Sequence, residues 1–279
     1  MNVIYEPKGK AREYSPLALN YYQGCNHGCL YCYVPDIQHR TRDDYQADVR
    51  VRPGILNKLR ADLQNNQVCD QVLLSFAGDP YCQANEEHKI TRQVLSLLLA
   101  FRVPTAILTK GGHRLLADLD ILQKFKDEGI PIKVGATLAF TDEADREKWE
   151  PGATELPDRL DALAQVKELG IRTWASLEPV VDPEQSLEII QLSLGVVDEY
   201  KLGKLNNVHP EIQKAIDWTA YTRKALDILH CQRPPVGIYV KKDLREATRG
   251  IEYSQDERTM DASALRGAGV AKQEQESLL

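Results

Sequence analysis

Three cysteines lie close together in the sequence, at Cys25, Cys29 and Cys32. Their C-x3-C-x2-C spacing allows one short loop to present three thiolates, and Gly24 and Gly28 supply the backbone freedom that a tight loop needs. Thiolates are the usual ligands of iron–sulfur clusters. The spacing therefore predicts that these cysteines bind three irons of a [4Fe–4S] cluster.

A four-iron cube that is held by three thiolates keeps one iron open. An open metal position is typical of a reactive site, as it is in catalytic zinc. S-adenosylmethionine (SAM) uses such a position, because its amino and carboxylate groups chelate the open iron. An electron from the cluster then breaks a sulfonium C–S bond and yields a 5′-deoxyadenosyl radical. The sequence thus predicts an enzyme in which this radical takes a hydrogen atom from a substrate.

Other uses of the cysteines stay open. A structural zinc site needs four ligands, usually in two pairs, whereas Cys25 is an odd third beside the pair Cys29 and Cys32. His27 is a candidate fourth ligand, although it sits inside the same loop, where it also suits a local structural role or a contact with the cluster or substrate. The alternative functions are an electron-transfer or sensing protein that does not cleave SAM, and a zinc-stabilised nucleic-acid-binding module.

Around these residues the chain resembles the spore photoproduct lyase-like group of the radical SAM superfamily. The resemblance extends over roughly residues 5–180 and includes the aromatic Tyr31 before the third cysteine. It is carried by residues 9–14 and 20–25, residues 78–81 with Glu86 and 91–92, residues 108–110, and residues 150–151 with 159–160.

The resemblance implies a partial (β/α)6 barrel that binds SAM at the C-terminal ends of its strands. By this analogy Gly78 and Asp79 meet the amino group of SAM, and Lys110 meets its carboxylate, which is a sensible charge pairing. The analogy also indicates two further kinds of contact: Thr137 with the carboxylate or ribose, and Tyr31 or Tyr33 with the adenine. Glu178 ends the fifth predicted strand, where a carboxylate suits a barrel active site, and is a candidate contact for SAM or substrate. An ordinary turn, strand or surface position is the alternative for most of these residues.

One position departs from the group. The true lyase, which repairs a thymine dimer, returns a hydrogen atom from a cysteine just before the aspartate-bearing segment, and Ala77 stands at the matching place here. Cys82 and Tyr81 are the candidate hydrogen donors that remain nearby, and an inert buried thiol is the alternative for Cys82. The resemblance therefore predicts radical chemistry on an unknown substrate, for which a nucleic-acid base is one candidate.

The elements that must position these residues alternate along the chain. Continuous apolar runs predict strands at 71–76, 103–109, 132–138, 171–177, 196–202 and 236–240. A 3.6-residue apolar period predicts helices at 86–100, 115–128, 155–169, 183–194 and 210–229. This order is typical of an α/β fold with a parallel sheet, and no G-x-G-x-x-G motif favours a doubly wound dinucleotide-binding sheet.

Composition sets outer limits. The 279 residues carry a net charge of −6, which does not suit bulk binding to DNA. No apolar run approaches the ~18 residues of a membrane span, and the first residues lack the pattern of a signal peptide, so we expect a cytoplasmic protein. Residues 1–250 are predicted to form the barrel domain and 251–279 a loosely ordered polar tail. SAM cleavage would also need an electron donor of the flavodoxin or ferredoxin type.

Overall fold

The computed structural model of the protein describes residues 2–205 and 209–259. Within this part of the chain eight strands form one sheet, in the order β1-β2-β5-β6-β7-β8-β9-β10. β1 is antiparallel to β2, and every other neighbouring pair is parallel. The strands are β1 (Ile4–Tyr5), β2 (Leu17–Leu19), β5 (Val72–Leu74), β6 (Thr105–Thr109), β7 (Ile132–Thr137), β8 (Arg172–Leu177), β9 (Glu199–Leu202) and β10 (Gly237–Val240).

The six predicted strands are confirmed as β5 to β10. Strands at the centre of a parallel sheet are covered on both faces, which is why they read as continuous apolar runs. β6 and β7 are neighbours at the centre of the sheet, in a register that runs from Thr105 opposite Ile132 to Thr109 opposite Ala136. β1 and β2 were not predicted, because two or three residues carry too little pattern to be recognised.

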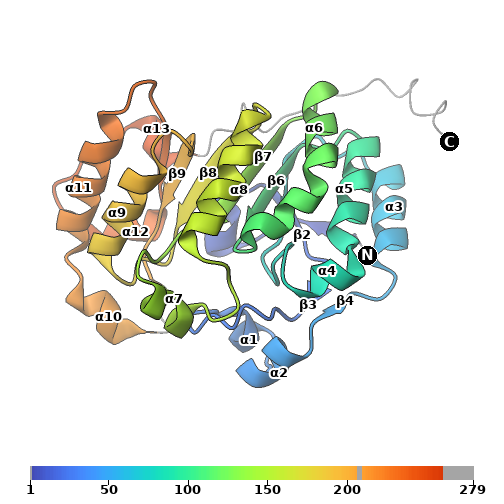
Figure 1. The fold of residues 1–279 in the computed structure, drawn as a ribbon, viewed down its shortest axis with the longest axis horizontal. Coiled ribbons are helices and arrows are strands. Elements are labelled where there is room, and N and C mark those ends of the chain that lie inside the picture. Colours follow the sequence, from blue (N-terminus) through green and yellow to red (C-terminus); the bar gives the residue numbers. More distant parts are fainter. Residues whose placement is uncertain (1, 206–208, 260–279) are drawn as a thin grey trace.

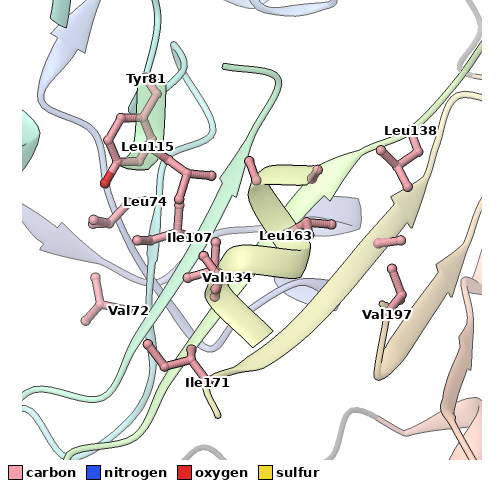
Figure 2. Packing of buried hydrophobic residues seen from close by; sticks show 14 of the residues in the cluster. Val72, Leu74, Tyr81, Ile107, Leu115, Val134, Leu138, Leu163, Ile171 and Val197 are labelled. Carbon is pink, nitrogen blue, oxygen red and sulfur yellow. The ribbon is translucent and has the colours of Figure 1, made fainter. Parts of the chain in front are cut away.

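Helices cover one face of the sheet (Figure 1). The longer ones are α3 (Ile55–Asn65), α5 (Ile90–Ala100), α6 (Leu119–Asp127), α8 (Leu156–Glu168), α9 (Pro183–Ser193) and α11 (Trp218–His230). Figure 2 shows Val72, Ile107 and Val134 from three neighbouring strands pointing toward this layer, with Leu163 of α8 beside them. Burial of this face is the main apolar contribution to stability.

Three predicted helices are each divided in two. The segment 86–100 consists of α4 (Ala84–His88) and α5, separated by Lys89 in a left-handed conformation with φ 48°. The segment 115–128 begins within a 3-10 helix, η2 (Gly112–Asp118), and continues as α6. The segment 210–229 contains α10 (Pro210–Ala215) and α11. Periodicity alone does not reveal such breaks, because the apolar positions continue in phase across them.

The inner face of the sheet, opposite the helices, is filled by side chains. Trp174 of β8 is fully buried there, opposite Gly135 of β7. A Cβ at Gly135 would lie 2.4 Å from the indole ring, so only glycine leaves room for it. The ammonium groups of Lys133 and Lys201 lie 5.4 and 5.5 Å from the indole ring, within cation–π range. The interior is therefore packed, and the space for ligands lies at the strand ends.

Short elements cover the C-terminal ends of the strands, at the bottom of Figure 1. They include α1 (Val34–Ile37), α2 (Arg42–Ala47), α7 (Glu143–Trp149) and the hairpin of β3 (Tyr22–Gln23) with β4 (Arg50–Val51). The three clustered cysteines lie between β3 and α1, and therefore at this end of the sheet.

The segment between β1 and β2 reaches across the inner face to β10. It contains the 3-10 helix η1 (Gly9–Glu13). The Glu13 carboxylate accepts hydrogen bonds from the Tyr239 hydroxyl and the Lys242 backbone N–H, both at 2.8 Å. Tyr14 follows it and packs edge-on against Phe76 near the opposite edge of the sheet. This connection therefore ties the two edges of the open sheet together.

After β10 the chain forms α12 (Lys242–Ala247) and α13 (Gln255–Arg258). Part of the segment predicted as a loose tail is thus ordered: Ser254 caps α13 in a capping box with Glu257, which also contacts His230 at 2.8 Å. The rest of that predicted tail, residues 260–279, lies outside the described residues. In the described part of the chain, no helix is long and apolar enough to span a bilayer.

Candidate functional site

The cysteine loop is held by backbone hydrogen bonds from two separate segments. The Cys25 N–H donates to the Tyr45 carbonyl in α2 at 3.1 Å. On the other side, the Gly152 N–H donates to the His27 carbonyl at 2.9 Å. Backbone contacts on both sides therefore hold the loop in place.

Both glycines of the loop are needed for its shape. Gly24 has φ 86°, and an added Cβ would lie 2.4 Å from the Asp48 carbonyl oxygen. Gly28 has φ 69°, and its Cβ would lie 2.9 Å from the ring of Pro151. Side chains are excluded at both places by conformation and by space, as the sequence predicted for a tight loop.

The three thiols are free and largely shielded from water. None forms a disulfide; Cys29 is buried, and Cys25 and Cys32 are partly buried. Burial raises the pKa of all three thiols, and that of Cys29 reaches about 12. The unliganded cysteines are therefore protonated at neutral pH, and metal ions must displace these protons on binding.

The arrangement fits a cluster held through several irons. Among residues 2–205 and 209–259, no three His, Cys, Asp or Glu side chains meet at one point as ligands of a single ion must. Thiolates that bind three different irons of a cube do not have to meet in this way. The buried hydroxyl of Tyr45 has no hydrogen-bond partner among the described residues, and the backbone of Tyr45 contacts the cysteine loop. An acceptor such as a cluster sulfur would satisfy it.

Asp79, at the end of β5, connects the cysteine loop to β6. Its carboxylate accepts hydrogen bonds from the backbone N–H groups of Tyr81 and Lys110, both at 2.8 Å, and from the Thr109 hydroxyl at 2.6 Å. His27 Nδ1 lies 3.5 Å from the same carboxylate. The Asp79 side chain is thus fully used within the protein, and a ligand at this point would meet backbone atoms of residues 78–81.

His27 is a neutral, buried imidazole. It is 2% exposed, and burial lowers its pKa to about 4. Its Nε2 atom has no hydrogen-bond partner within the described chain. His27 therefore carries no charge at neutral pH, and one ring nitrogen remains available in the loop.

Lys110 places a positive charge near the cysteines. Its ammonium lies 5.6 Å from the centre of the Tyr31 ring, and it forms no ion pair in the part of the chain that is described. After burial, this charge is the largest influence on the Cys29 thiol, where it acts against the rise in pKa. The Lys110 carbonyl accepts from the Thr154 N–H at 3.1 Å, which fixes the backbone.

A buried ion pair supports the far side of the loop. Glu150 is 0% exposed and accepts hydrogen bonds from the Tyr31 hydroxyl and from Arg159 Nη2, the latter at 2.7 Å. Arg159 also donates to the Thr137 carbonyl at 2.8 Å. Tyr31 is therefore tied through Glu150 and Arg159 to the end of β7, and its hydroxyl is already engaged.

The other predicted SAM contacts differ in their exposure. Tyr33 is 41% exposed and thus open to a ligand, whereas Thr137 is 3% exposed. Glu178 accepts hydrogen bonds from the Tyr14 hydroxyl and the Lys241 ammonium, both at 2.5 Å. The carboxylate is held in one orientation at the end of β8, and a positive charge lies next to it.

Cys82 and Tyr81 are both fully buried. The Tyr81 hydroxyl donates to Asp118 at 3.1 Å, and its ring lies among core residues such as Leu115 (Figure 2). Burial raises the pKa of Cys82 to about 12, with Asp79 as the next cause. Cys82 also lines a surface cavity of about 450 Å³ together with residues of α4, α5 and η2.

Sequence reasoning missed several residues of this site. Tyr45 lies 13 residues after Cys32 and outside the motif, and Tyr14 and Lys241 come from opposite ends of the chain. Glu150 and Arg159 were noted in one family segment, but their ion pair was not predicted. The only available signal for these contacts was the predicted barrel itself, because parallel strands bring their C-terminal ends together.

Comparison with known proteins identifies the family. The profile of the radical SAM superfamily matches residues 19–193, more than half of the chain. The chain belongs to the radical SAM superfamily. Its cofactors are a [4Fe–4S] cluster and SAM. The predicted superfamily is confirmed.

Relatives of similar sequence occur in cellular organisms and in a virus. An uncharacterized protein of Methanocaldococcus jannaschii is 26% identical over 173 residues, which cover 62% of this chain and 63% of the relative. An uncharacterized protein of Mycobacterium tuberculosis is 26% identical over 168 residues, which cover 58% of this chain and 49% of the relative. The chain thus matches less than two thirds of the length of these relatives.

Solved structures of radical SAM enzymes share the fold. Spore photoproduct lyase superposes with a TM-score of 0.57 at 15% identity, over 76% of this chain and 62% of the lyase. SuiB of Streptococcus suis, bound to SAM, gives a TM-score of 0.58 at 15% identity, over 88% of this chain and 55% of SuiB. The predicted partial barrel is therefore confirmed.

Proposed function

We propose that this radical SAM enzyme cleaves SAM reductively at a [4Fe–4S] cluster held by Cys25, Cys29 and Cys32. When bound, the cluster and SAM supply a 5′-deoxyadenosyl radical that abstracts hydrogen from a substrate. The observation that carries this proposal is the rigid loop of three free, shielded thiols at the C-terminal ends of parallel strands. In a barrel enzyme, reactive groups occupy that end.

The chain's own residues would bind and orient SAM. In this proposal the unpaired Lys110 ammonium pairs with the methionine carboxylate, since a charge-assisted hydrogen bond is strong in a shielded site. Backbone atoms of Gly78 and Asp79 meet the amino group, because the Asp79 carboxylate has its own partners. Of the two candidate tyrosines, Tyr33 suits the adenine better, since the Tyr31 hydroxyl already donates to Glu150.

Two groups at the strand ends would line the remaining space. Glu178, held by Tyr14 and Lys241, offers an oriented carboxylate to the SAM ribose or to the substrate. Thr137 acts from the end of β7 through the little surface that it exposes. Both residues would also help to exclude water, which a reactive radical requires.

Return of a hydrogen atom to the substrate is assigned to Cys82 rather than Tyr81. The Tyr81 hydroxyl is directed to Asp118 in the core, whereas the Cys82 thiol lies close enough to Cys25 to influence its pKa. A protonated thiol is the form that donates a hydrogen atom, and burial keeps Cys82 protonated.

For the substrate we propose a nucleic-acid base, with a flavodoxin- or ferredoxin-type protein as electron donor. The base is suggested by the sequence segments shared with the spore photoproduct lyase-like group. One solved structure of that lyase contains a dinucleoside spore photoproduct. A flipped base needs only a local groove, so the acidic net charge of the chain is compatible with it.

The test is anaerobic reconstitution with iron and sulfide, followed by reduction with dithionite and addition of SAM. We expect four irons per chain and formation of 5′-deoxyadenosine. The Cys25→Ala, Cys29→Ala, Cys32→Ala triple variant should lose both. Cys69→Ala with Cys231→Ala is the matched control, because these two cysteines are exposed and outside the site.

Other results would favour the alternatives. Zinc in place of iron would indicate a structural zinc module, and a stable cluster that never cleaves SAM would indicate electron transfer or sensing. Addition of oligonucleotides tests the substrate class separately. If peptides but not oligonucleotides increase the rate of 5′-deoxyadenosine formation, the base proposal fails while SAM cleavage stands.

A further inference from the structure

A buried phenol without a partner lies beside the three cysteines. Tyr45 of α2 is 2% exposed, and its hydroxyl makes no hydrogen bond to any described residue. Native proteins rarely leave a buried hydroxyl unsatisfied, so such a group calls for an acceptor that the polypeptide does not itself supply.

The surroundings of Tyr45 place it against the cluster loop. Its carbonyl accepts the Cys25 N–H at 3.1 Å. Burial, and then the neighbouring Cys25 and Cys32, raise the pKa of the Tyr45 phenol, and Cys29 acts in the same direction. The three thiols therefore share the electrostatic environment of this hydroxyl, and the Tyr45 backbone contacts their loop directly.

The chain also fixes the position of the Tyr45 ring. The Arg40 guanidinium lies 5.6 Å from the ring centre, within cation–π range. Thr41 caps α2 by accepting the Asp44 N–H at 3.1 Å. The backbone at Gly24 approaches so closely that a Cβ would lie 2.6 Å from the Tyr45 carbonyl oxygen. The hydroxyl is thus presented by a rigid support.

We propose that the Tyr45 hydroxyl donates a hydrogen bond to a sulfur of the [4Fe–4S] cluster and thereby raises its reduction potential. The inference rests on the proposed function, since it needs the cluster at Cys25, Cys29 and Cys32. A donor withdraws electron density from the sulfur, which favours the reduced cluster. Tyr45 is then a positioning and tuning residue for the electron that cleaves SAM.

The deciding experiment compares the reduction potential of reconstituted wild type with that of Tyr45→Phe, by redox titration monitored with electron paramagnetic resonance. The variant removes one oxygen atom and keeps the ring. We expect the equilibrium constant for reduction to fall about tenfold, which is about 59 mV for a one-electron couple. Tyr22→Phe is the control: it is equally buried, and its hydroxyl has a partner, Asn85, outside the cysteine loop.

A second substitution moves the potential in the other direction. Incorporation of 3-fluorotyrosine at position 45 keeps the hydroxyl and makes it a stronger donor, so the potential should rise. The protein with 3-fluorotyrosine also tests the hydrogen bond if Tyr45→Phe does not retain its cluster.

The outcomes separate the two proposals. A potential that falls in Tyr45→Phe, stays constant in Tyr22→Phe and rises with 3-fluorotyrosine supports the hydrogen bond. Four-iron clusters of unchanged potential in the proteins altered at position 45 overturn this inference and leave SAM cleavage intact. A wild type without a four-iron cluster overturns both.

Discussion

Replacing Arg159 by methionine removes the guanidinium that neutralises the buried Glu150 carboxylate. Glu150 is 0% exposed and Arg159 is 3% exposed, and their nitrogen–oxygen distance is 2.7 Å. Removal of one partner of such a pair costs about 3–5 kcal/mol, because the other charge stays buried. An attraction of about 4 kcal/mol for two charges ~4 Å apart at an effective dielectric constant of ~20 agrees with this value.

The cost should depend on pH in a defined direction. Burial already raises the pKa of Glu150, although Arg159 acts against the rise. Without Arg159 the folded-state pKa rises further above that of the unfolded chain. Between the unfolded-state and the folded-state pKa of Glu150, the folded protein binds more protons than the unfolded chain. The stability of Arg159→Met therefore falls as pH rises through this range. The variant should therefore lose more stability at pH 8 than at pH 5.

Urea unfolding followed by circular dichroism measures both effects. Lys224→Met is the control, since its partner Glu184 is an exposed residue in a surface pair, for which we expect a loss below about 1 kcal/mol. The double variant Glu150→Gln, Arg159→Met should recover part of the loss. The reasoning is refuted if Arg159→Met unfolds within 1 kcal/mol of wild type at pH 8, or if the double variant is no better than the single one.

The remaining predictions concern the interior, the loop and SAM. Burial lowers the pKa of Lys201 to about 7, against about 10.5 in the unfolded chain. Wild-type stability should therefore rise with pH between these values. For Lys201→Met, the urea midpoint should change less steeply with pH over the same range. Gly24→Ala should abolish iron binding on reconstitution, whereas Gly195→Ala, at a similar φ of 82° but with no atom within 4 Å, should cost only about 1 kcal/mol and keep the iron. Lys110→Met should raise the SAM concentration for half-maximal 5′-deoxyadenosine formation about tenfold or more, the equivalent of ~1.5 kcal/mol. Its iron content should not change. If the half-maximal SAM concentration is also unchanged, Lys110 does not contact SAM.

The fold was largely predictable because its central strands obey simple rules. β5 to β9 are largely buried, and together with the edge strand β10 they were recognised as apolar runs. The edge strand β1 and its neighbour β2 were not, because their pairing is set by contacts with distant residues and not by a local pattern. The break between α4 and α5 depends on one left-handed residue, Lys89, which has no distinctive sequence signal.

The site could be predicted only where its residues form a motif of neighbouring positions in the sequence. The cysteine spacing and its glycines identified the loop, since a tight loop leaves few alternatives. Other contacts depend on which side chains the barrel brings together. These are the Glu150 and Arg159 ion pair, the surroundings of the Tyr45 hydroxyl, and the contacts of Glu178 with Tyr14 and Lys241. Those distances come from packing, and no spacing along the chain encodes them.

The connection between β1 and β2 has a consequence for the order in which parts of the chain can fold. Glu13 is bound by Tyr239 and Lys242, which lie 226 and 229 residues later in the chain. These partners leave the ribosome only near the end of synthesis, so the first-made segment must wait for the last strand. Closing so long a loop is slow, and it adds no stability until the contacts between its ends have formed. The nascent barrel therefore remains open at one edge until the last strand has been made.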